Sequence, residues 1–181
     1  AIISLCGRVS ISADDRFSIK IHTESAPVAR KYFTLLGKTF NIIADVSIRN
    51  SLCGKKSFTY SVAVGNHEDA LKILMATKLL GEDGQVGEVL PPRKNMVVKH
   101  ICCRRAFLRG AFLASGSISD PEKSYHFEIV CAAQEKARQL QGIIGTFGLE
   151  ARIVVRKNHF VVYLKEGSQI VDILNVMEAP V

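Results

Sequence analysis

The sequence predicts an α+β fold made of two similar halves, each with the element order αββαββα and an antiparallel sheet. Short segments alternate apolar and polar side chains, as strands with one buried face do. Longer segments carry apolar stripes at helical spacing. The order of these segments in residues 1–80 recurs in residues 99–178. We therefore expect two halves related by an approximate two-fold axis.

Matching residues define the repeat. Ile21 matches Ile129 at an offset of 108, and Ile73 matches Ile173 at an offset of 100. A one-residue deletion and a shorter second hairpin account for the change in offset. The expected organisation is a first half at 1–80, a linker rich in Gly, Pro and acidic residues at 81–98, a second half at 99–178, and a further linker beginning at 179–181.

Local patterns place the elements of each half. In the first half we expect strands at Val9–Ser12 and Phe17–His22, a helix capped by Ser25 and reaching Phe40, strands at 44–49 and Phe58–Val64, and a helix at His67–Leu80. In the second half we expect a helix at Lys99–Ala114, a strand at Tyr125–Cys131, a helix at Gln134–Phe147, strands at Ala151–Arg156 and His159–Lys165, and a helix at Gln169–Met177. The two residues Lys157 and Asn158 suit a tight hairpin turn.

One segment points to a known motif. Leu108-Arg-Gly-Ala-Phe-Leu-Ala-Ser-Gly116 has small residues at Gly110, Ala111 and Ala114, which would let a second helix approach closely. Glycine at position 116 would let the chain leave the helix and enter a strand directly. The segment resembles the LAGLIDADG motif of homing endonucleases. That resemblance implies antiparallel sheets shaped as a saddle and two such helices packed at the two-fold axis, each delivering one acid to a metal site.

The acid is missing from both copies of this motif. Alignment on Gly116 puts Ser115 at the acid position, and the repeat puts Cys6 and Gly7 at the corresponding positions of the first half. Metal-assisted phosphodiester hydrolysis needs hard oxygen ligands, usually carboxylates. Asp14, Asp15 and Asp120 are near in sequence but read as turn formers. We therefore expect no nuclease activity, no metal site and no cofactor.

Longer stretches extend the resemblance to the WhiA family. They are Arg105-Ala-Phe-Leu-Arg-Gly-Ala-Phe-Leu-Ala-Ser-Gly-Ser117, Asp120-Pro-Glu-Lys-Ser-Tyr-His-Phe-Glu-Ile-Val130 and Val161-Val-Tyr-Leu-Lys-Glu-Gly167. The family consists of bacterial transcription regulators associated with sporulation or cell division. Its members carry a degenerate LAGLIDADG domain followed by a helix-turn-helix domain. This sequence holds no candidate for the second domain, so we expect the principal DNA reader of the family to be absent from it.

Charge and strand parity suggest how such a domain would contact DNA. The net charge is +7 and the isoelectric point about 9.3, which favours an anionic partner. Side chains alternate between the two faces of a strand, which places one set of basic residues on the face that the helices leave open. The tips of the hairpins carry a second set. These candidate contacts to double-stranded DNA are Arg16, Lys20, His22, Arg49, Arg152 and Arg156 on the strands, and Lys55, Lys56 and Lys157 at the tips. Asp45 and Glu128 share the face and interrupt a uniform basic track.

An alternative function remains open at this point. The same fold could serve as a scaffold that binds other transcription proteins or its own C-terminal helix-turn-helix domain.

The composition also bears on the compartment. The five cysteines have no C-x-x-C spacing, which favours reduced thiols, and no apolar run is long enough to span a membrane. We expect a cytoplasmic, nucleoid-associated protein.

Overall fold

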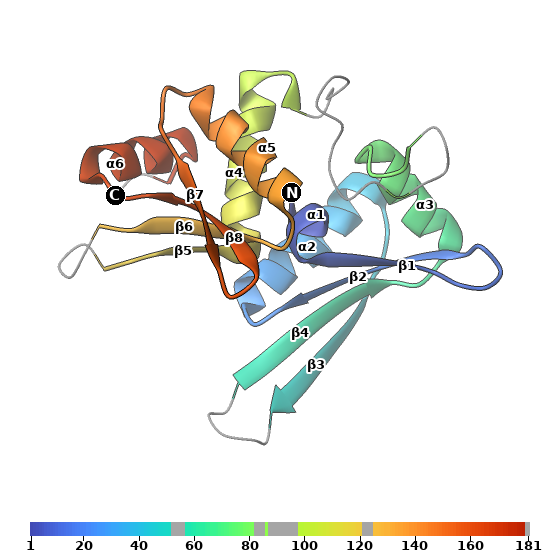
Figure 1. Ribbon diagram of the computed structural model, residues 1–181. Helices are drawn as coiled ribbons and strands as arrows, with labels where there is room; N and C mark the ends of the chain where they lie inside the picture. Colours follow the sequence, from blue (N-terminus) through green and yellow to red (C-terminus); the bar gives the residue numbers. More distant parts are fainter. Residues whose placement is uncertain (52–56, 82–85, 87–97, 121–124, 180–181) are drawn as a thin grey trace. The chain divides into compact units, whose positions relative to one another are not determined.

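The computed structural model describes residues 1–51, 57–81, 86, 98–120 and 125–179 (Figure 1). The chain divides into two compact units, which we call the first unit (Ile2–Gly87) and the second unit (Glu88–Val181). Within the described residues, no helix has the length and apolar character needed to cross a membrane.

Both units have the αββαββα order. The first unit contains α1 (Ile2–Cys6), β1 (Gly7–Ile11), β2 (Phe17–Thr23), α2 (Ala26–Phe40), β3 (Asp45–Ser51), β4 (Ser57–Val64) and α3 (His67–Ala76). The second unit contains α4 (Ile101–Ser115), β5 (Gly116–Ile118), β6 (Phe127–Cys131), α5 (Gln134–Gly145), β7 (Arg152–Arg156), β8 (His159–Leu164) and α6 (Gly167–Val176). The sheets run β1-β2-β4-β3 and β5-β6-β8-β7, and every pairing is antiparallel. The predicted α+β fold is confirmed.

The strand register reproduces the repeat read from the sequence. Ile21 pairs with Gly7 on one side and Val62 on the other. Its counterpart Ile129 pairs with Gly116 and Val162 in the same way. Both isoleucines are fully buried. The offset of 108 therefore joins residues that hold the same place in the two sheets.

Each unit has its own core between one face of the sheet and its helices. In the first unit α2 and α3 cover this face, and α5 and α6 lie on one face of the second sheet (Figure 1). The buried helix positions correspond across the repeat, with Ala29, Tyr32, Leu36, Ala70 and Ile73 matched by Ala137, Leu140, Ile144, Ile170 and Ile173. Aliphatic burial of this kind is the main favourable term in folding. These helices do not cover the opposite face of either sheet.

Gly7 and Gly116 connect a helix to a strand without an intervening loop. Each is the first residue of its strand and directly follows the last helical residue. A Cβ at Gly116 would lie 2.7 Å from the carbonyl oxygen of Phe112, and a Cβ at Gly7 would lie 2.8 Å from the Cα of Ile3. Gly116 has an ordinary extended backbone, with φ −87°. Glycine is needed at these positions because of close approach, not because of a positive φ.

Several local predictions need correction. The strand expected from Tyr125 begins at Phe127, and the short strand Gly116–Ile118 was not among the expected ranges. Helix α3 ends at Ala76 and not at Leu80, because Lys78 adopts a left-handed conformation with φ 55°. Helix α5 ends at Gly145 and not at Phe147, and the Thr146 hydroxyl donates to the Ile143 carbonyl. Ser25 occupies the N-cap of α2, but its side chain makes no capping hydrogen bond.

The helix-side face of the β3–β4 hairpin is less covered than its alternation indicates. Val46 and Ile48 point to the apolar side as expected, since Val46 pairs with the buried Val62. They are nevertheless exposed. The hairpin extends beyond the helices of its unit (Figure 1), so part of its apolar face has no helix above it.

Candidate nucleic-acid interface

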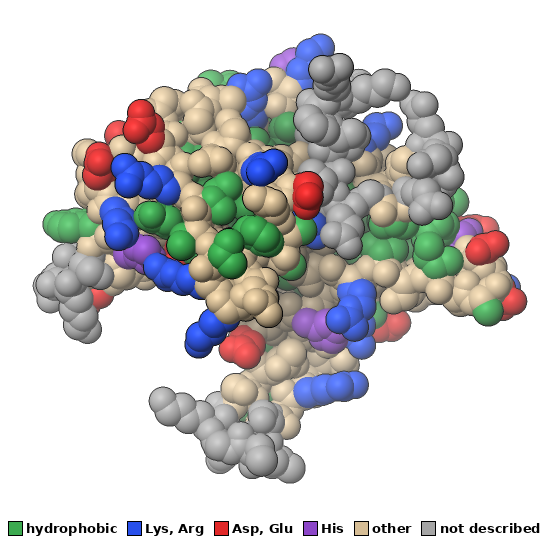
Figure 2. Space-filling view, viewed as in Figure 1, with side chains coloured by type: hydrophobic (Ala, Val, Ile, Leu, Met, Phe, Trp, Pro, Cys, Tyr) green, Lys and Arg blue, Asp and Glu red, His purple; other side chains and the backbone are tan. Residues whose placement is uncertain are grey.

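The open face of the first sheet collects basic side chains from three strands. Arg8 on β1 pairs with Lys20 on β2, and both point away from the core. His22 follows on β2 and pairs with Ser61 of β4. Arg49 lies on the same face of β3. We call Arg8, Lys20, His22 and Arg49 the basic face. Figure 2 shows Lys and Arg side chains gathered near a histidine over these strands.

The pKa of His22 is affected by the other charges of the basic face. Its Nδ1 lies 2.8 Å from the hydroxyl oxygen of Ser61, which is buried. Desolvation, and then the charges of Lys20, Arg8 and Arg49, hold the pKa of His22 below its usual value. None of these three cations forms an ion pair with an acid in the described part of the chain. The basic face is therefore a cluster of like charges that forms no ion pair within the described residues, although Asp45 shares this sheet face in register with Lys20 across Ala63.

The remaining predicted residues of the first unit are placed as follows. Arg16 is exposed but lies in the turn before β2. Lys55 and Lys56 lie outside the described residues. Arg8 was not among the predicted contacts, because the first strand was expected to begin at Val9 and it begins at Gly7. Extending the hairpin pairing by one residue from Val9 and Ile19 would have found it.

The open face of the second sheet differs because an acid sits among its donors. The carboxylate of Glu128 accepts from Ser117 Oγ at 3.1 Å and from the Arg156 guanidinium at 3.2 Å, and lies 2.8 Å from His126 Nε2. We call these four residues the Glu128 cluster. Burial works against the charge of Glu128. The hydrogen bonds from His126 and Ser117, with the charges of His126 and Arg156, outweigh burial and lower the pKa of the carboxyl.

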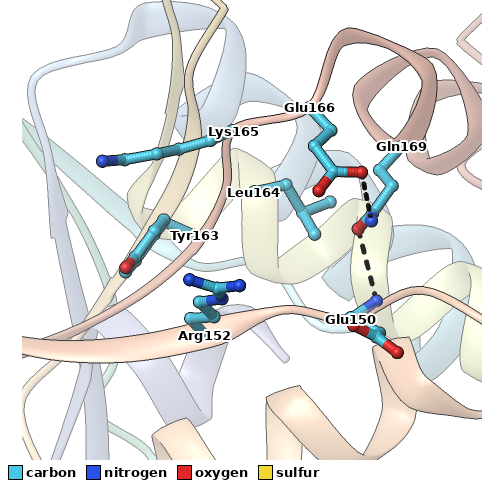
Figure 3. Close-up of a pocket in the computed structure, with 7 residues that line it drawn as sticks. All are labelled: Glu150, Arg152, Tyr163, Leu164, Lys165, Glu166 and Gln169. Atoms are coloured by element: carbon cyan, nitrogen blue, oxygen red, sulfur yellow. Dashed lines mark hydrogen bonds between the residues drawn. The ribbon is translucent and has the colours of Figure 1, made fainter.

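Arg152 occupies a different setting on the same sheet. It pairs with Tyr163 of β8 and lines a small pocket (Figure 3). The pocket is lined by Glu150, Arg152, Tyr163, Leu164, Lys165, Glu166 and Gln169. The Gln169 amide is held at both ends, since it donates to Glu166 at 2.9 Å and accepts from the backbone N–H of Glu150 at 3.3 Å. Lys157 is exposed at the tip of the β7–β8 turn.

The predicted acid positions of the motif lie at the two helix ends. Cys6 ends α1 and Ser115 ends α4. Burial raises the pKa of the Cys6 thiol, which contacts the Ile2 carbonyl at 3.3 Å. The Ser115 hydroxyl oxygen is buried and has no hydrogen-bond partner within the described residues. Those residues also contain no group of three or more His, Cys, Asp or Glu side chains that could hold a metal ion.

The small residues of α4 differ in burial. Ala111 is fully buried, and Gly110 and Ala114 are partly buried. Helix α4 packs on α5 and β6 within the second unit. The pairing of Gly110, Ala111 and Ala114 with a helix of the first half stays a prediction.

Two solved structures show the same fold. The crystal structure of the N-terminal LAGLIDADG domain of DUF199/WhiA matches with a TM-score of 0.70 at 19% identity, covering 97% of this chain and 76% of that one. The homing endonuclease I-DmoI in complex with DNA and Mn matches with a TM-score of 0.61 at 10% identity, covering 99% of this chain and 96% of that one. These likenesses establish a LAGLIDADG-like architecture.

Sequence relatives identify the family. A probable cell division protein WhiA of Lachnoclostridium phytofermentans is 50% identical over 181 residues, covering 99% of this chain and 57% of the relative. One of Clostridium perfringens strain 13 is 41% identical over 180 residues, covering 99% and 56%. The chain thus spans little more than half the length of these relatives. A model of the WhiA N-terminal LAGLIDADG-like domain matches residues 1–80, and one of the WhiA LAGLIDADG-like domain matches residues 104–180. The chain belongs to the WhiA family.

Proposed function

We propose that this chain binds double-stranded DNA through the basic face of its first unit and does not cut it, as part of a regulator of transcription in cell division or sporulation. The observation that carries the proposal is the convergence of Arg8, Lys20 and Arg49 around His22 with no acid paired to them. Relatives named as probable cell division proteins support the cellular role. The structural neighbour solved with DNA supports the ligand class.

A DNA backbone suits this arrangement for a physical reason. Cations held close together repel one another, and a polyanion relieves that repulsion while releasing its own counterions. Arg8, Lys20 and Arg49 come from three different strands, so they present charge over an area and not at a point. Contacts of this kind position a protein on the phosphate backbone without reading the sequence. We therefore assign the basic face a positioning role.

A charge-matched pair of variants tests this assignment. The double variant Lys20→Ala/Arg49→Ala removes two cations from the basic face. The control Arg30→Ala/Lys31→Ala removes two exposed cations from α2, which covers the other side of the sheet. Fluorescence anisotropy with a labelled duplex should show an affinity loss of about tenfold for the first variant at low salt, and a salt slope shallower by about two. Equal losses in both variants would rule out a specific role for this face.

The proposal that the chain does not cleave DNA rests on the chemistry of Cys6 and Ser115. A thiol with a raised pKa and a neutral hydroxyl lack the charge that carboxylate ligands give to Mg²⁺. Purified protein should leave supercoiled plasmid intact in the presence of Mg²⁺ or Mn²⁺. Metal-dependent nicking that disappears in Asp14→Ala or Asp120→Ala would show relocated catalysis instead.

A second candidate function is binding of a protein partner. Val46, Ile48 and Phe58 are exposed on the apolar side of the β3–β4 hairpin. Apolar side chains grouped on an exposed surface are typical of protein contacts. If the chain shows no affinity for duplex DNA at low salt, and Ile48→Ser abolishes binding to a transcription protein, the scaffold function replaces the DNA-binding one.

A further inference from the structure

Three hydrogen-bond donors of different kinds converge on one carboxylate in the second unit. A guanidinium, an imidazole and a hydroxyl, from Arg156, His126 and Ser117, lie 2.8 to 3.2 Å from the two oxygens of Glu128. The side chains of Glu128 and His126 are 21% and 25% exposed, so the group is accessible from the open face of the sheet. These donors come from β5, from the residue before β6, and from β7.

We infer that Arg156, His126 and Ser117 form a binding site for a phosphate of nucleic acid, which the Glu128 carboxylate fills in the absence of a ligand. This inference rests on the proposed DNA-binding function. A carboxylate and a phosphodiester are both anionic oxygen acceptors, and both take charge-assisted hydrogen bonds from guanidinium and imidazole. Glu128 thus supplies the three donors with the anionic oxygen acceptors that a phosphate of the DNA backbone would supply.

The internal carboxylate makes the two strand faces unequal. On the basic face, Arg8, Lys20 and Arg49 have no acidic partner within the described residues, whereas Arg156 has one. A phosphate can bind all three donors together only by displacing Glu128, whose pKa is lowered and which is therefore charged at neutral pH. Glu128 consequently lowers the affinity of the second face for any polyanion. Replacing it with a neutral isostere should open the site.

Glu128→Gln tests the inference as a gain of affinity. Glutamine has the same shape and still accepts from Ser117, but it leaves Arg156 without a counter-charge. The control Asp172→Asn makes the same change in net charge on the exposed surface of α6. We expect duplex affinity of Glu128→Gln to rise about threefold or more at low salt, with a salt slope steeper by about one, while Asp172→Asn changes neither by as much. Glu128→Ala provides a second variant in case the first is poorly folded.

Variants without Arg156 show whether the gain of affinity in Glu128→Gln depends on this guanidinium. Arg156→Ala alone should change duplex affinity little, because the guanidinium is already paired with Glu128. The double variant Glu128→Gln/Arg156→Ala should fall back to the affinity of the unaltered protein. Equal gains in Glu128→Gln and Asp172→Asn, or a gain that survives loss of Arg156, would overturn the inference. If inorganic phosphate stabilises Glu128→Gln thermally while duplex affinity stays constant, the site takes free anions and the assignment to nucleic acid is wrong.

The outcome is separable from that of the proposed function. Lys20→Ala/Arg49→Ala reports on the basic face of the first unit, and Glu128→Gln reports on the second. Loss of affinity in the former with no gain in the latter would retain DNA binding and refute only the filled phosphate site. A protein that binds no duplex refutes the proposed function. A duplex affinity that then appears in Glu128→Gln would still support the phosphate site, and its absence would refute that site too.

Discussion

The imidazole of His22 lies 2.8 Å from the hydroxyl oxygen of Ser61, between strands β2 and β4 and in the middle of the basic face. The contact fixes the ring next to Lys20, Arg8 and Arg49, whose charges oppose its protonation. An arriving phosphate would act in the opposite direction and favour the imidazolium form. Proton uptake and DNA binding should therefore be linked at this residue.

The first prediction is that DNA affinity rises as the pH falls below about 6.5, the ordinary imidazole value, because the pKa of His22 in the free protein lies lower than that. His22→Gln should flatten this part of the pH profile, and anisotropy titrations across the range would measure it. In the absence of DNA, the lowered pKa of His22 makes a fall in pH act in the opposite direction on folding, decreasing stability where it increases DNA affinity. A lowered pKa means that the unfolded chain binds more protons, so the free energy of unfolding falls as the pH falls below about 6.5. His22→Gln should therefore lose less stability on acidification. An identical pH dependence in both proteins would contradict the linkage.

The second prediction concerns the two glycines that join helix to strand. Gly116→Ala would place a methyl group against Phe112, and Gly7→Ala would place one against the backbone of Ile3. Neither backbone can move without displacing its strand, so each substitution should cost about 1–3 kcal/mol of unfolding free energy. The control Gly142→Ala lies at an exposed position of helix α5 with open space around it, and should be neutral or stabilising by up to about 1 kcal/mol. Urea unfolding would separate the two classes of site.

Much of the fold was predictable because the repeat and the strand alternation are properties of the sequence itself. Ile21 and Ile129 can be matched from the sequence alone, and their burial and register confirm the match. The end of α3 could not be predicted, since Lys78 adopts a left-handed conformation that lysine rarely adopts. The local bond from the Leu79 N–H to the Leu74 carbonyl closes the end of the helix around this residue, and Leu79 is buried directly after it.

The site was predictable only in part, for a related reason. Parity along one strand places Lys20, Arg152 and Arg156 on an open face, which requires no knowledge of the neighbouring strands. The partner of Arg156 depends on packing, because Glu128 lies on β6 and Arg156 on β7, with β8 between them. Glu128 could be assigned to the face from sequence, but its contacts with three donors could not. Only the structure therefore distinguishes Arg156, which is paired with an acid, from Lys20, which forms no ion pair within the described residues.

The third prediction concerns the turn between β7 and β8. Lys157 and Asn158 both have positive φ, 47° and 64°, as a type I′ hairpin turn requires. Lysine is strained there, whereas Asn-Gly is the favoured pair for this turn, so Lys157→Asn/Asn158→Gly should raise the unfolding free energy by about 0.5–1 kcal/mol.

The matched control for the turn is Asn175→Gly on α6, where the backbone is helical and the residue exposed. It introduces the same glycine at a negative φ and should lower stability, because glycine is a poor helix former. Thermal or urea unfolding of the two variants should give shifts of opposite sign. A loss of stability in both would mean that the flexibility glycine adds to the unfolded chain outweighs the relief of strain at the turn.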